Sequence, residues 1–206
     1  MTSLGPGQRV GIWFQGCSIG CAGCVSRDTW VSDEQHDTTV AEVLQAVEEL
    51  TDGSPDGVTI SGGEPFEQPE ALLELLQAIR SWPVSVNRTA DVLVYSGMPL
   101  EVLEERYSAI VALVDVLITD PYVAANSSDD GLRGSANQRV TIRTQLGASR
   151  FEGAQLSGIP GPRRIQVSVD EKNIWMIGIP RRGDLLAVER AALQRGVAIG
   201  RVSWRA

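Results

Sequence analysis

The sequence is poor in the residues that most metal sites and hydrolytic sites require. It has one histidine, His36, and three cysteines in 206 residues. A single histidine without a supporting motif excludes most His-rich metal centres and gives no basis for a Ser-His-Asp or Cys-His catalytic group. An odd number of cysteines cannot close into an internal disulfide framework. The cysteines must therefore serve another purpose.

Basic clusters and long apolar runs are also missing. The chain has 18 Lys and Arg against 26 Asp and Glu, a formal charge of −8, and no run of five or six basic residues. This argues against nucleic acid or an anionic membrane as a partner. No stretch of 18 apolar residues occurs, and the first residues have neither a basic nor an apolar segment typical of a signal peptide. We therefore expect no membrane association and a cytoplasmic location.

Strand-like and helix-like segments alternate along the first two thirds of the chain. Short β-branched runs are separated by segments in which apolar residues recur at helical spacing. This alternation predicts an α/β fold with a parallel sheet or partial (βα) barrel. Residues 144–164 read as an irregular connection, and a hairpin within 165–179 and a helix over 184–194 follow it. We expect a core over residues 1–143 and a C-terminal extension over 144–206. The expected core strands lie at 9–15, 58–60, 91–95, 114–118 and 139–142.

All three cysteines lie in one short loop after the first expected strand. Their spacing is Cys17-x3-Cys21-x2-Cys24. Thiolates are soft ligands that select zinc or an iron–sulfur cluster over hard cations. A cubane cluster held by three thiolates keeps one iron open for a substrate or cofactor. A structural zinc site needs a fourth ligand, for which only His36 is available, so a zinc-stabilised binding module is the less favoured alternative.

A second motif follows the next expected strand. Gly62 and Gly63 let backbone groups approach a ligand closely, and Glu64 can accept hydrogen bonds from an ammonium group. Taken alone, a Gly-Gly-x-Pro turn is more often an ordinary βα connection. Its position after a strand that neighbours the cysteine loop makes a shared site the better interpretation.

Together these motifs resemble the radical S-adenosylmethionine (SAM) superfamily, and within it the activating enzymes of glycyl-radical enzymes. The resemblance covers about residues 4–143. The Arg-Gly-Ser-x-Asn-Gln stretch narrows it to the activating-enzyme branch, with anaerobic ribonucleotide reductase as the first candidate for the partner. The matching stretches are LGPGQR at 4–9, WFQGCSIGCAGC at 13–24 with Thr29-Trp30, VTISGGEP at 58–65, and RGSANQ at 133–138.

The resemblance implies two cofactors and a set of roles. The three cysteines would hold a [4Fe–4S] cluster whose open iron binds the amino and carboxylate groups of SAM, and one-electron reduction would then yield a 5′-deoxyadenosyl radical. Gly62, Gly63 and Glu64 would line the methionine end of SAM. The backbone of Gly23, Cys24 and Val25 would lie beside the adenine. Many superfamily members carry an aromatic residue at the position of Gly23, so adenine contacts must come partly from elsewhere.

Three further residues are weaker candidates for cofactor binding. Ser96 and Asp120 follow the third and fourth expected strands, where βα loops converge on ligands. Arg133 could pair with a carboxylate of SAM or of the partner. The competing interpretations are an ordinary turn at Ser96 and a surface ion pair at Arg133.

The resemblance also implies partners, which the C-terminal extension leaves open. A glycyl-radical enzyme would be the protein substrate, and an external one-electron donor such as flavodoxin or ferredoxin would reduce the cluster. Residues 144–206 have no counterpart in the minimal activating proteins. They could dock a particular glycyl-radical enzyme or cap a different substrate, so a radical SAM enzyme acting on a small molecule or ribosomal peptide is a second alternative.

Overall fold

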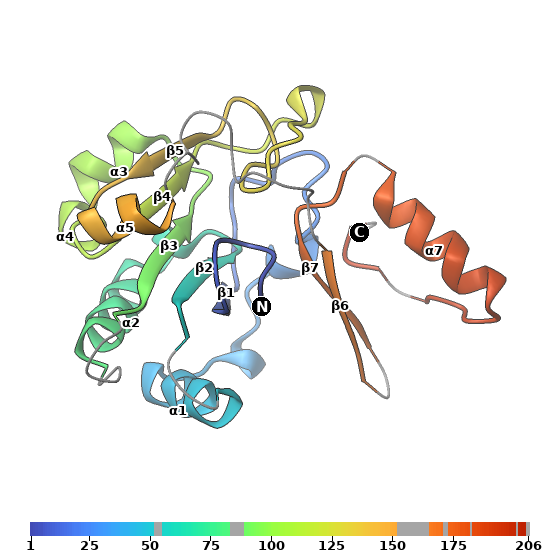
Figure 1. The fold of residues 1–206 in the computed structure, drawn as a ribbon, viewed down its shortest axis with the longest axis horizontal. Coiled ribbons are helices and arrows are strands. Elements are labelled where there is room, and N and C mark those ends of the chain that lie inside the picture. The colour runs from blue at the N-terminus through green and yellow to red at the C-terminus, as the bar shows by residue number, and fades with distance from the viewer. Residues whose placement is uncertain are drawn as a thin grey trace.

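The computed structural model describes residues 1–51, 55–82, 89–151, 165–170, 173–181, 183–200 and 202–204. A five-stranded sheet forms the centre of the core (Figure 1). Its strands are adjacent in sequence order, so each new strand adds to the same edge of the sheet. They are β1 (Arg9–Phe14), β2 (Gly57–Gly62), β3 (Asp91–Tyr95), β4 (Val116–Thr119) and β5 (Arg139–Ile142).

The expected parallel sheet is confirmed for β1 to β4, whereas β5 pairs antiparallel with β4. The reason is the connection: in the described structure only the short η4 (Ala124–Asn126) intervenes between β4 and β5, and no α-helix returns the chain to the opposite end of the sheet. The α/β class is therefore established. Closure of the sheet into a partial barrel stays a prediction.

An α-helix follows each of the strands β1 to β3, and most of these helices begin where the sequence indicates. The capping box at Thr39 and Glu42 is present, with each side chain binding the other residue's backbone N–H. One expectation was wrong: residues 145–150 form a helix, because the Thr144 hydroxyl caps it by accepting from the N–H of Gly147. Residues 152–164 lie outside the described residues. The core α-helices are α1 (Val40–Leu50), α2 (Pro69–Ser81), α3 (Leu100–Arg106), α4 (Ser108–Val111) and α5 (Gln145–Arg150).

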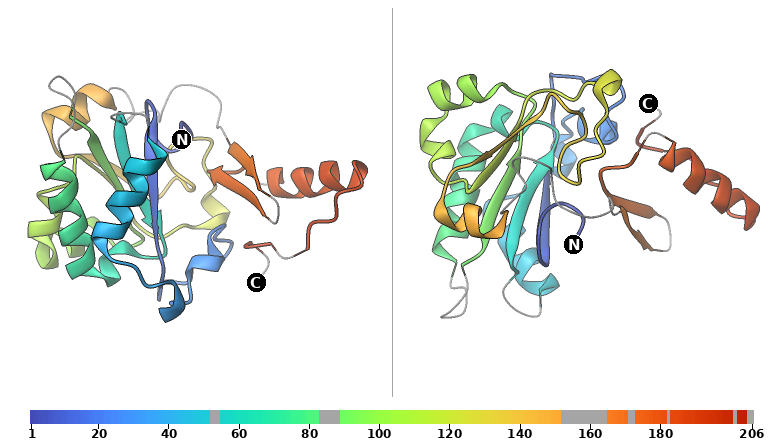
Figure 2. Two further views of the ribbon diagram at one scale, coloured as in Figure 1. Left: turned by 90° about the horizontal axis from the view of Figure 1, so that it is seen from below. Right: turned by 45° about the horizontal axis from the view of Figure 1, so that its top comes forward.

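Alternating side chains of the sheet build a core on each of its faces. On one face, residues such as Ile60 and Val94 pack with α2, α3 and α4 in the larger cluster. On the other face, Leu93 and Ile118 pack against Phe151. Figure 2 shows α1 to α4 together on the first face. The loops after the parallel strands therefore emerge at one end of the strands, from a sheet that is packed on both faces.

A buried ion pair links neighbouring strands at the opposite end of the sheet, where β1 and β3 begin. The guanidinium of Arg9 binds both carboxylate oxygens of Asp91 at 2.7 and 3.0 Å, and both side chains are 0% exposed. Arg9 also donates to the hydroxyl of Thr59 at 2.8 Å and to the carbonyl of Val58 at 2.9 Å. A Cβ at Gly57 would lie 2.3 Å from this guanidinium. The pair thus ties β1, β2 and β3 together below the loops.

The C-terminal extension forms a hairpin and a helix beside the core (Figures 1 and 2). Strands β6 (Ile165–Val169) and β7 (Ile174–Gly178) pair antiparallel, and α7 spans Asp184–Gln194, as the sequence predicts. None of the residues of α7 is fully buried. In the part of the chain that the structure describes, no helix is both long enough and apolar enough to cross a bilayer.

Candidate iron–sulfur and nucleoside site

The candidate residues gather where β1 to β4 end. The cysteine loop follows β1, Gly63 and Glu64 follow β2, Ser96 follows β3, and Asp120 follows β4. In parallel sheets, ligands bind in the crevice beyond the carboxyl ends of the strands. The topology therefore brings together residues separated by more than a hundred positions in the sequence.

The cysteine loop is held at both ends by backbone hydrogen bonds. Gly16 and Cys17 donate to the carbonyls of Thr29 and Trp30 at 2.8 and 3.0 Å, which closes the loop. The three cysteines are free and half-buried. Burial raises the pKa of the Cys21 thiol, and the neighbouring thiols of Cys24 and Cys17 add to this rise, while a backbone hydrogen bond from Tyr122 opposes it. The closed loop therefore carries all three thiols on one short segment.

Gly62 and Gly63 bring the β2 loop into backbone contact with the β1 loop. A Cβ at Gly63 would lie 2.1 Å from the carbonyl oxygen of Gly16, and one at Gly62 would lie 2.4 Å from that of Phe14. The N–H of Gly63 donates to Phe14 at 2.7 Å and that of Glu64 to Gly16 at 2.8 Å. Only glycine allows this approach, so the glycines fix the position of the cysteine loop.

The side chain of Glu64 points inward and joins the loops after β2 and β3. It is 1% exposed, accepts from the Ser96 hydroxyl at 2.9 Å and the Gly97 N–H at 2.7 Å, and caps η3 (Pro65–Glu67) through the Phe66 N–H at 3.1 Å. Burial raises the pKa of Glu64, and the three donors oppose that rise. The structure shows Glu64 and Ser96 as a brace. Their contact with an ammonium group stays a prediction.

Asp120 lies in a strained backbone conformation next to an arginine. Its φ of +80° is the only positive value of a non-glycine residue in the described ranges. Arg139 binds its carboxylate at 2.6 and 3.1 Å and also binds Glu101 at 2.6 and 2.9 Å. This arginine lowers the pKa of Glu101 to about 2, and both carboxylates raise the pKa of Arg139. Arg139 of β5 and the hydroxyl of Thr119 thus hold the Asp120 carboxylate, and its contact with a ligand stays a prediction.

Arg133 holds its own loop in place. It binds Asp130 at 2.6 Å and donates to the carbonyl of Gln138 at 3.1 Å. The Gln138 side chain accepts from the N–H of Gly134 at 2.9 Å, and the Ser135 hydroxyl accepts from Val123 at 3.1 Å. The RGSANQ motif therefore positions the segment after β4. A contact of Arg133 with SAM or a partner stays a prediction.

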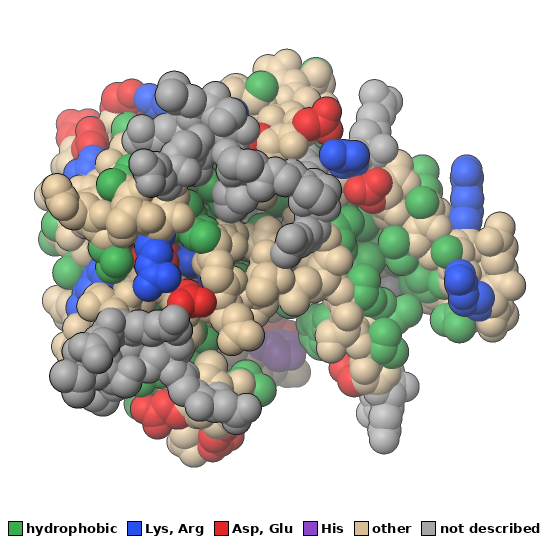
Figure 3. Space-filling view, viewed as in Figure 1, with side chains coloured by type: hydrophobic (Ala, Val, Ile, Leu, Met, Phe, Trp, Pro, Cys, Tyr) green, Lys and Arg blue, Asp and Glu red, His purple; other side chains and the backbone are tan. Residues whose placement is uncertain are grey.

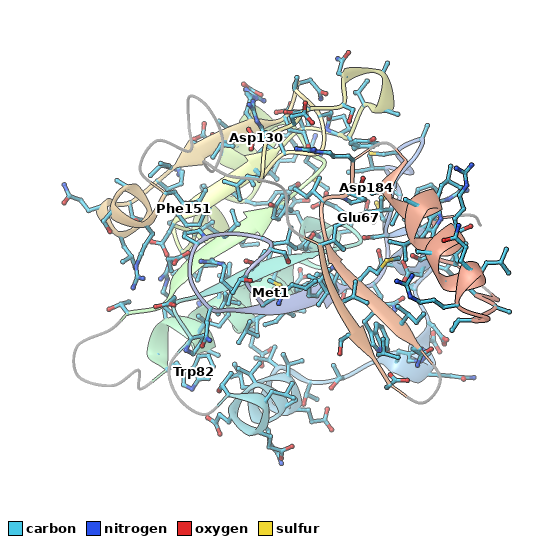
Figure 4. The ribbon with its side chains drawn as sticks, turned by 45° about the vertical axis from the view of Figure 1, so that its right-hand side comes forward. Met1, Glu67, Trp82, Asp130, Phe151 and Asp184 are labelled. Carbon is cyan, nitrogen blue, oxygen red and sulfur yellow. The ribbon has the colours of Figure 1, made fainter. Side chains whose placement is uncertain are left out.

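Sequence reasoning missed two residues that hold the cysteine loop. Glu67, labelled in Figure 4, accepts from the backbone N–H of Ser18 at 3.0 Å and from its hydroxyl at 2.6 Å. The backbone N–H of Tyr122 lies beside the Cys21 thiol and opposes the rise in its pKa. The only signal for Glu67 is its position shortly after Gly-Gly-Glu-Pro. No sequence signal identifies Tyr122, because its backbone makes the contact.

The comparisons with known proteins agree with this geometry. Residues 3–141 match the family described as "4Fe-4S single cluster domain". The anaerobic ribonucleoside-triphosphate reductase-activating protein of Escherichia coli K12 is 31% identical over 142 residues, which cover 66% of this chain and 89% of that protein. The Vibrio cholerae protein of the same name is 29% identical, with coverages of 66% and 88%. The pyruvate formate-lyase-activating enzyme of Clostridium pasteurianum is 40% identical over 76 residues, 35% of this chain and 32% of that enzyme.

These matches define an iron–sulfur domain built on the sheet and its loops. The chain belongs to the 4Fe-4S single cluster domain family. It is a member of the radical SAM branch whose relatives are activating enzymes, and its cofactors are an iron–sulfur cluster and SAM. The family match ends at residue 141, so the hairpin and α7 lie outside it.

The donor set of the cysteine loop fits the cluster. Three free thiols on one loop are the ligands that iron–sulfur clusters use. His36, the only candidate for a fourth zinc ligand, is exposed and pairs with Asp33 at 3.0 Å. Within the described ranges, no group of three or more His, Cys, Asp or Glu side chains is arranged for a metal ion. Three thiols, with His36 paired elsewhere, therefore fit a cluster better than a structural zinc ion, which takes four protein ligands.

Proposed function

We propose that this chain is an activating enzyme that generates a glycyl radical on a partner protein, with anaerobic ribonucleotide reductase as the first candidate. The observation that carries the proposal is the cysteine loop held against Gly62 and Gly63 at the carboxyl edge of the sheet. The relatives support the choice of partner, because those that cover most of the family match are named for activating that reductase.

In this proposal Cys17, Cys21 and Cys24 hold the [4Fe–4S] cluster. When bound, the cluster and SAM supply the one-electron chemistry that removes a hydrogen atom from a substrate carbon. The chain itself positions the thiols: the backbone of Thr29 and Trp30 closes the loop. Partial burial of the loop limits contact with water, which protects reactive species.

The chain's residues also bind and orient SAM in this proposal. Gly62 and Gly63 line the methionine end of SAM beside the cluster. Glu64 accepts from the ammonium group with its remaining lone pairs and, together with Ser96, keeps the two loops in register. Gly23 to Val25 provide the backbone edge beside the adenine. Glu64 then acts both as a ligand and as a brace.

Asp120 and Arg133 act as positioning residues at the far end of the site. Asp120 is fixed by Arg139, and Arg133 by Asp130, so both hold the segment after β4. That segment presents Tyr122 to the cysteine loop. Besides keeping the cofactor site in shape, Asp120 contacts the cofactor, and Arg133 pairs with a carboxylate of SAM or of the partner protein.

The proposed activity also assigns the parts of the chain, its electron donor and its location. We assign residues 1–143 to the radical SAM core, with the sheet as part of a partial barrel, and residues 144–206 to an extension. A one-electron carrier such as flavodoxin or ferredoxin supplies the electron, and the protein works in the cytoplasm. The open edge of the sheet leaves room for a loop of a large protein substrate.

Anaerobic reconstitution tests the proposal. Protein loaded with iron and sulfide, then reduced, is expected to cleave SAM to methionine and 5′-deoxyadenosine. With the candidate reductase added, electron paramagnetic resonance is expected to show a glycyl radical. Cys21→Ala should abolish both, whereas His36→Ala should leave both unchanged.

Each alternative predicts a different result. A zinc-stabilised binding module gives a colourless protein with zinc, and His36→Ala then removes the metal. An enzyme for a small molecule or ribosomal peptide cleaves SAM but forms no radical on any glycyl-radical enzyme. Either result would overturn the proposed activity.

A further inference from the structure

A cavity of about 450 Å³ opens beside the cysteine loop. Its volume is in the range of pockets that hold small ligands. Gly23 and Val25 of the cysteine loop and Tyr122, Ala124 and Ala125 of the segment after β4 form its core side. Residues of the C-terminal extension form the opposite side, namely Pro180, Arg181, Gly183, Leu185, Leu186 and Trp204. The two walls thus come from the family-matched segment and from the chain beyond it.

The extension is attached to the cysteine loop at this place. The Ser203 hydroxyl donates to the carbonyl of Val25 at 3.1 Å. The indole N–H of Trp204 donates to Glu189 of α7 at 3.0 Å, which links the terminal segment to the helix. Arg181 lies 3.5 Å from Asp129 in the segment after β4. These contacts hold the second wall opposite the first.

The strand order sets the distance between the Gly62–Gly63 loop and this cavity. Gly62 ends β2 and Gly63 follows it, whereas Tyr122 follows β4, two strands away. Neighbouring strands are about 4.8 Å apart, so these loops are separated by about 10 Å. A ligand whose amino-acid end lies at Gly62 and Gly63 can therefore reach Tyr122 with its nucleoside end.

The walls have the chemistry of a nucleobase site. Trp204 and Tyr122 offer aromatic surface, and Val25 and Leu185 are apolar. Aromatic rings bind nucleobases by stacking, because every base has a π face. Gly23 adds no side chain: a Cβ there would point at Ala124 and Tyr122, 3.4 and 3.5 Å away. The space beside Tyr122 therefore stays open for a flat group.

We propose that Trp204 and Leu185 of the C-terminal extension form the second wall of the pocket that binds the adenosyl group of SAM. This rests on the proposed function, which places SAM at the cysteine loop. Figure 3 shows hydrophobic side chains gathered over the hairpin and helix of the extension. The extension then serves as a cap over the nucleoside.

Equilibrium dialysis of the 206-residue chain tests this without measuring turnover. The probes are S-adenosylhomocysteine and methionine with cluster-loaded protein, and 5′-deoxyadenosine with iron-free protein. Trp204→Ala is expected to weaken binding of both nucleosides by about tenfold, because stacking on the indole is lost. Methionine binding should not change. Leu185→Ala should weaken the nucleosides in the same direction.

Matched variants separate stacking on the Trp204 ring from its hydrogen bond to Glu189. Trp204→Phe keeps an aromatic ring but loses the hydrogen bond to Glu189, and it should bind nucleosides within about threefold of the parent. Trp175→Ala removes an indole that is 55% exposed on β7 and lies outside the cavity, and it should have no effect. Ala124→Leu fills the cavity from the core side and should weaken the nucleosides even with Trp204 in place.

Two outcomes would overturn the proposal that the extension caps the adenosyl group. Unchanged nucleoside binding in Trp204→Ala and Ala124→Leu would show that the cavity is not the adenosyl site. Loss of glycyl-radical formation with unchanged nucleoside binding would assign the cavity to a segment of the partner. Failure of the parent protein to bind iron would instead refute the proposed function. Binding of 5′-deoxyadenosine to the iron-free protein would still test whether the extension forms the nucleoside pocket.

Discussion

The hydroxyl of Ser96 donates to the carboxylate of Glu64 at 2.9 Å, and this contact joins two loops at the centre of the site. The carboxylate is buried with three hydrogen-bond donors around it. The same residue that a sequence motif marks for ligand binding therefore also maintains the geometry of the site.

Replacing Glu64 by Gln is expected to alter the pH dependence of stability. Burial raises the pKa of Glu64 above its ordinary value of 4.5. A carboxyl with a raised pKa favours the folded state below its ordinary pKa, and that contribution is lost as the pH rises through the folded pKa. Glu64→Gln should remove this decline, which urea unfolding at several pH values above 4.5 measures.

The same variant should lower the free energy of unfolding near neutral pH by ~1–3 kcal/mol. One carboxylate oxygen becomes an amide N–H₂, which cannot accept from the surrounding hydrogen-bond donors. Glu48→Gln on the exposed side of α1 is the matched control and should change neither quantity. A pH profile identical in the parent and Glu64→Gln would contradict the prediction.

Breaking the ion pair of Arg9 and Asp91 is expected to destabilise the fold strongly. Removing one partner leaves a buried charge unpaired, and Asp91→Ala should cost ~3–5 kcal/mol in unfolding free energy. The double variant Arg9→Met, Asp91→Leu should recover part of this loss, because no buried charge remains. Arg143→Met, which removes an exposed pair with Glu104, should cost less than ~1 kcal/mol. Equal losses at the two sites would refute the prediction.

A methyl group at Gly63 is expected to prevent cluster assembly. Its Cβ would clash with the carbonyl of Gly16, so the loop that carries the cysteines must move. Gly63→Ala should therefore bind much less iron after anaerobic reconstitution, as elemental analysis would show. Gly20→Ala is the control within the same loop: it meets no atom within 4 Å, although its φ of +60° costs ~1–2 kcal/mol. Full iron content in Gly63→Ala would be the contrary result.

Removing Arg139 is expected to release the Glu101 carboxylate. Arg139 lowers the pKa of Glu101 to about 2, so the stabilisation from this pair is present above 4.5 and is lost as the pH falls toward 2. In Arg139→Met the pKa of Glu101 should return toward 4.5, which carboxyl NMR titration measures. Hydrogen exchange in residues 121–127 should also become faster, because Asp120 loses its partner. An unchanged titration would exclude this role for Arg139.

Much of the fold could be predicted from local patterns. The alternation of strands and helices, the capping box at Thr39 and the helix over 184–194 are determined by the residues that form them. The antiparallel direction of β5 was not predictable in this way, because it depends on how the loop after β4 returns to the sheet. The helix at 145–150 was missed because Gly147 weakens the local helix preference; in the structure the Thr144 cap and close packing of Gly147 on the backbone of Asp115 stabilise it.

The sequence by itself determined the chemistry of this protein, because three thiols at fixed spacing and two glycines after a strand are local features. Only the tertiary structure decided that Glu64 braces Ser96, that Arg139 holds Asp120, and that Trp204 faces the cysteine loop. These contacts join residues far apart in the chain. Their existence depends on strand order and packing, which no short segment encodes.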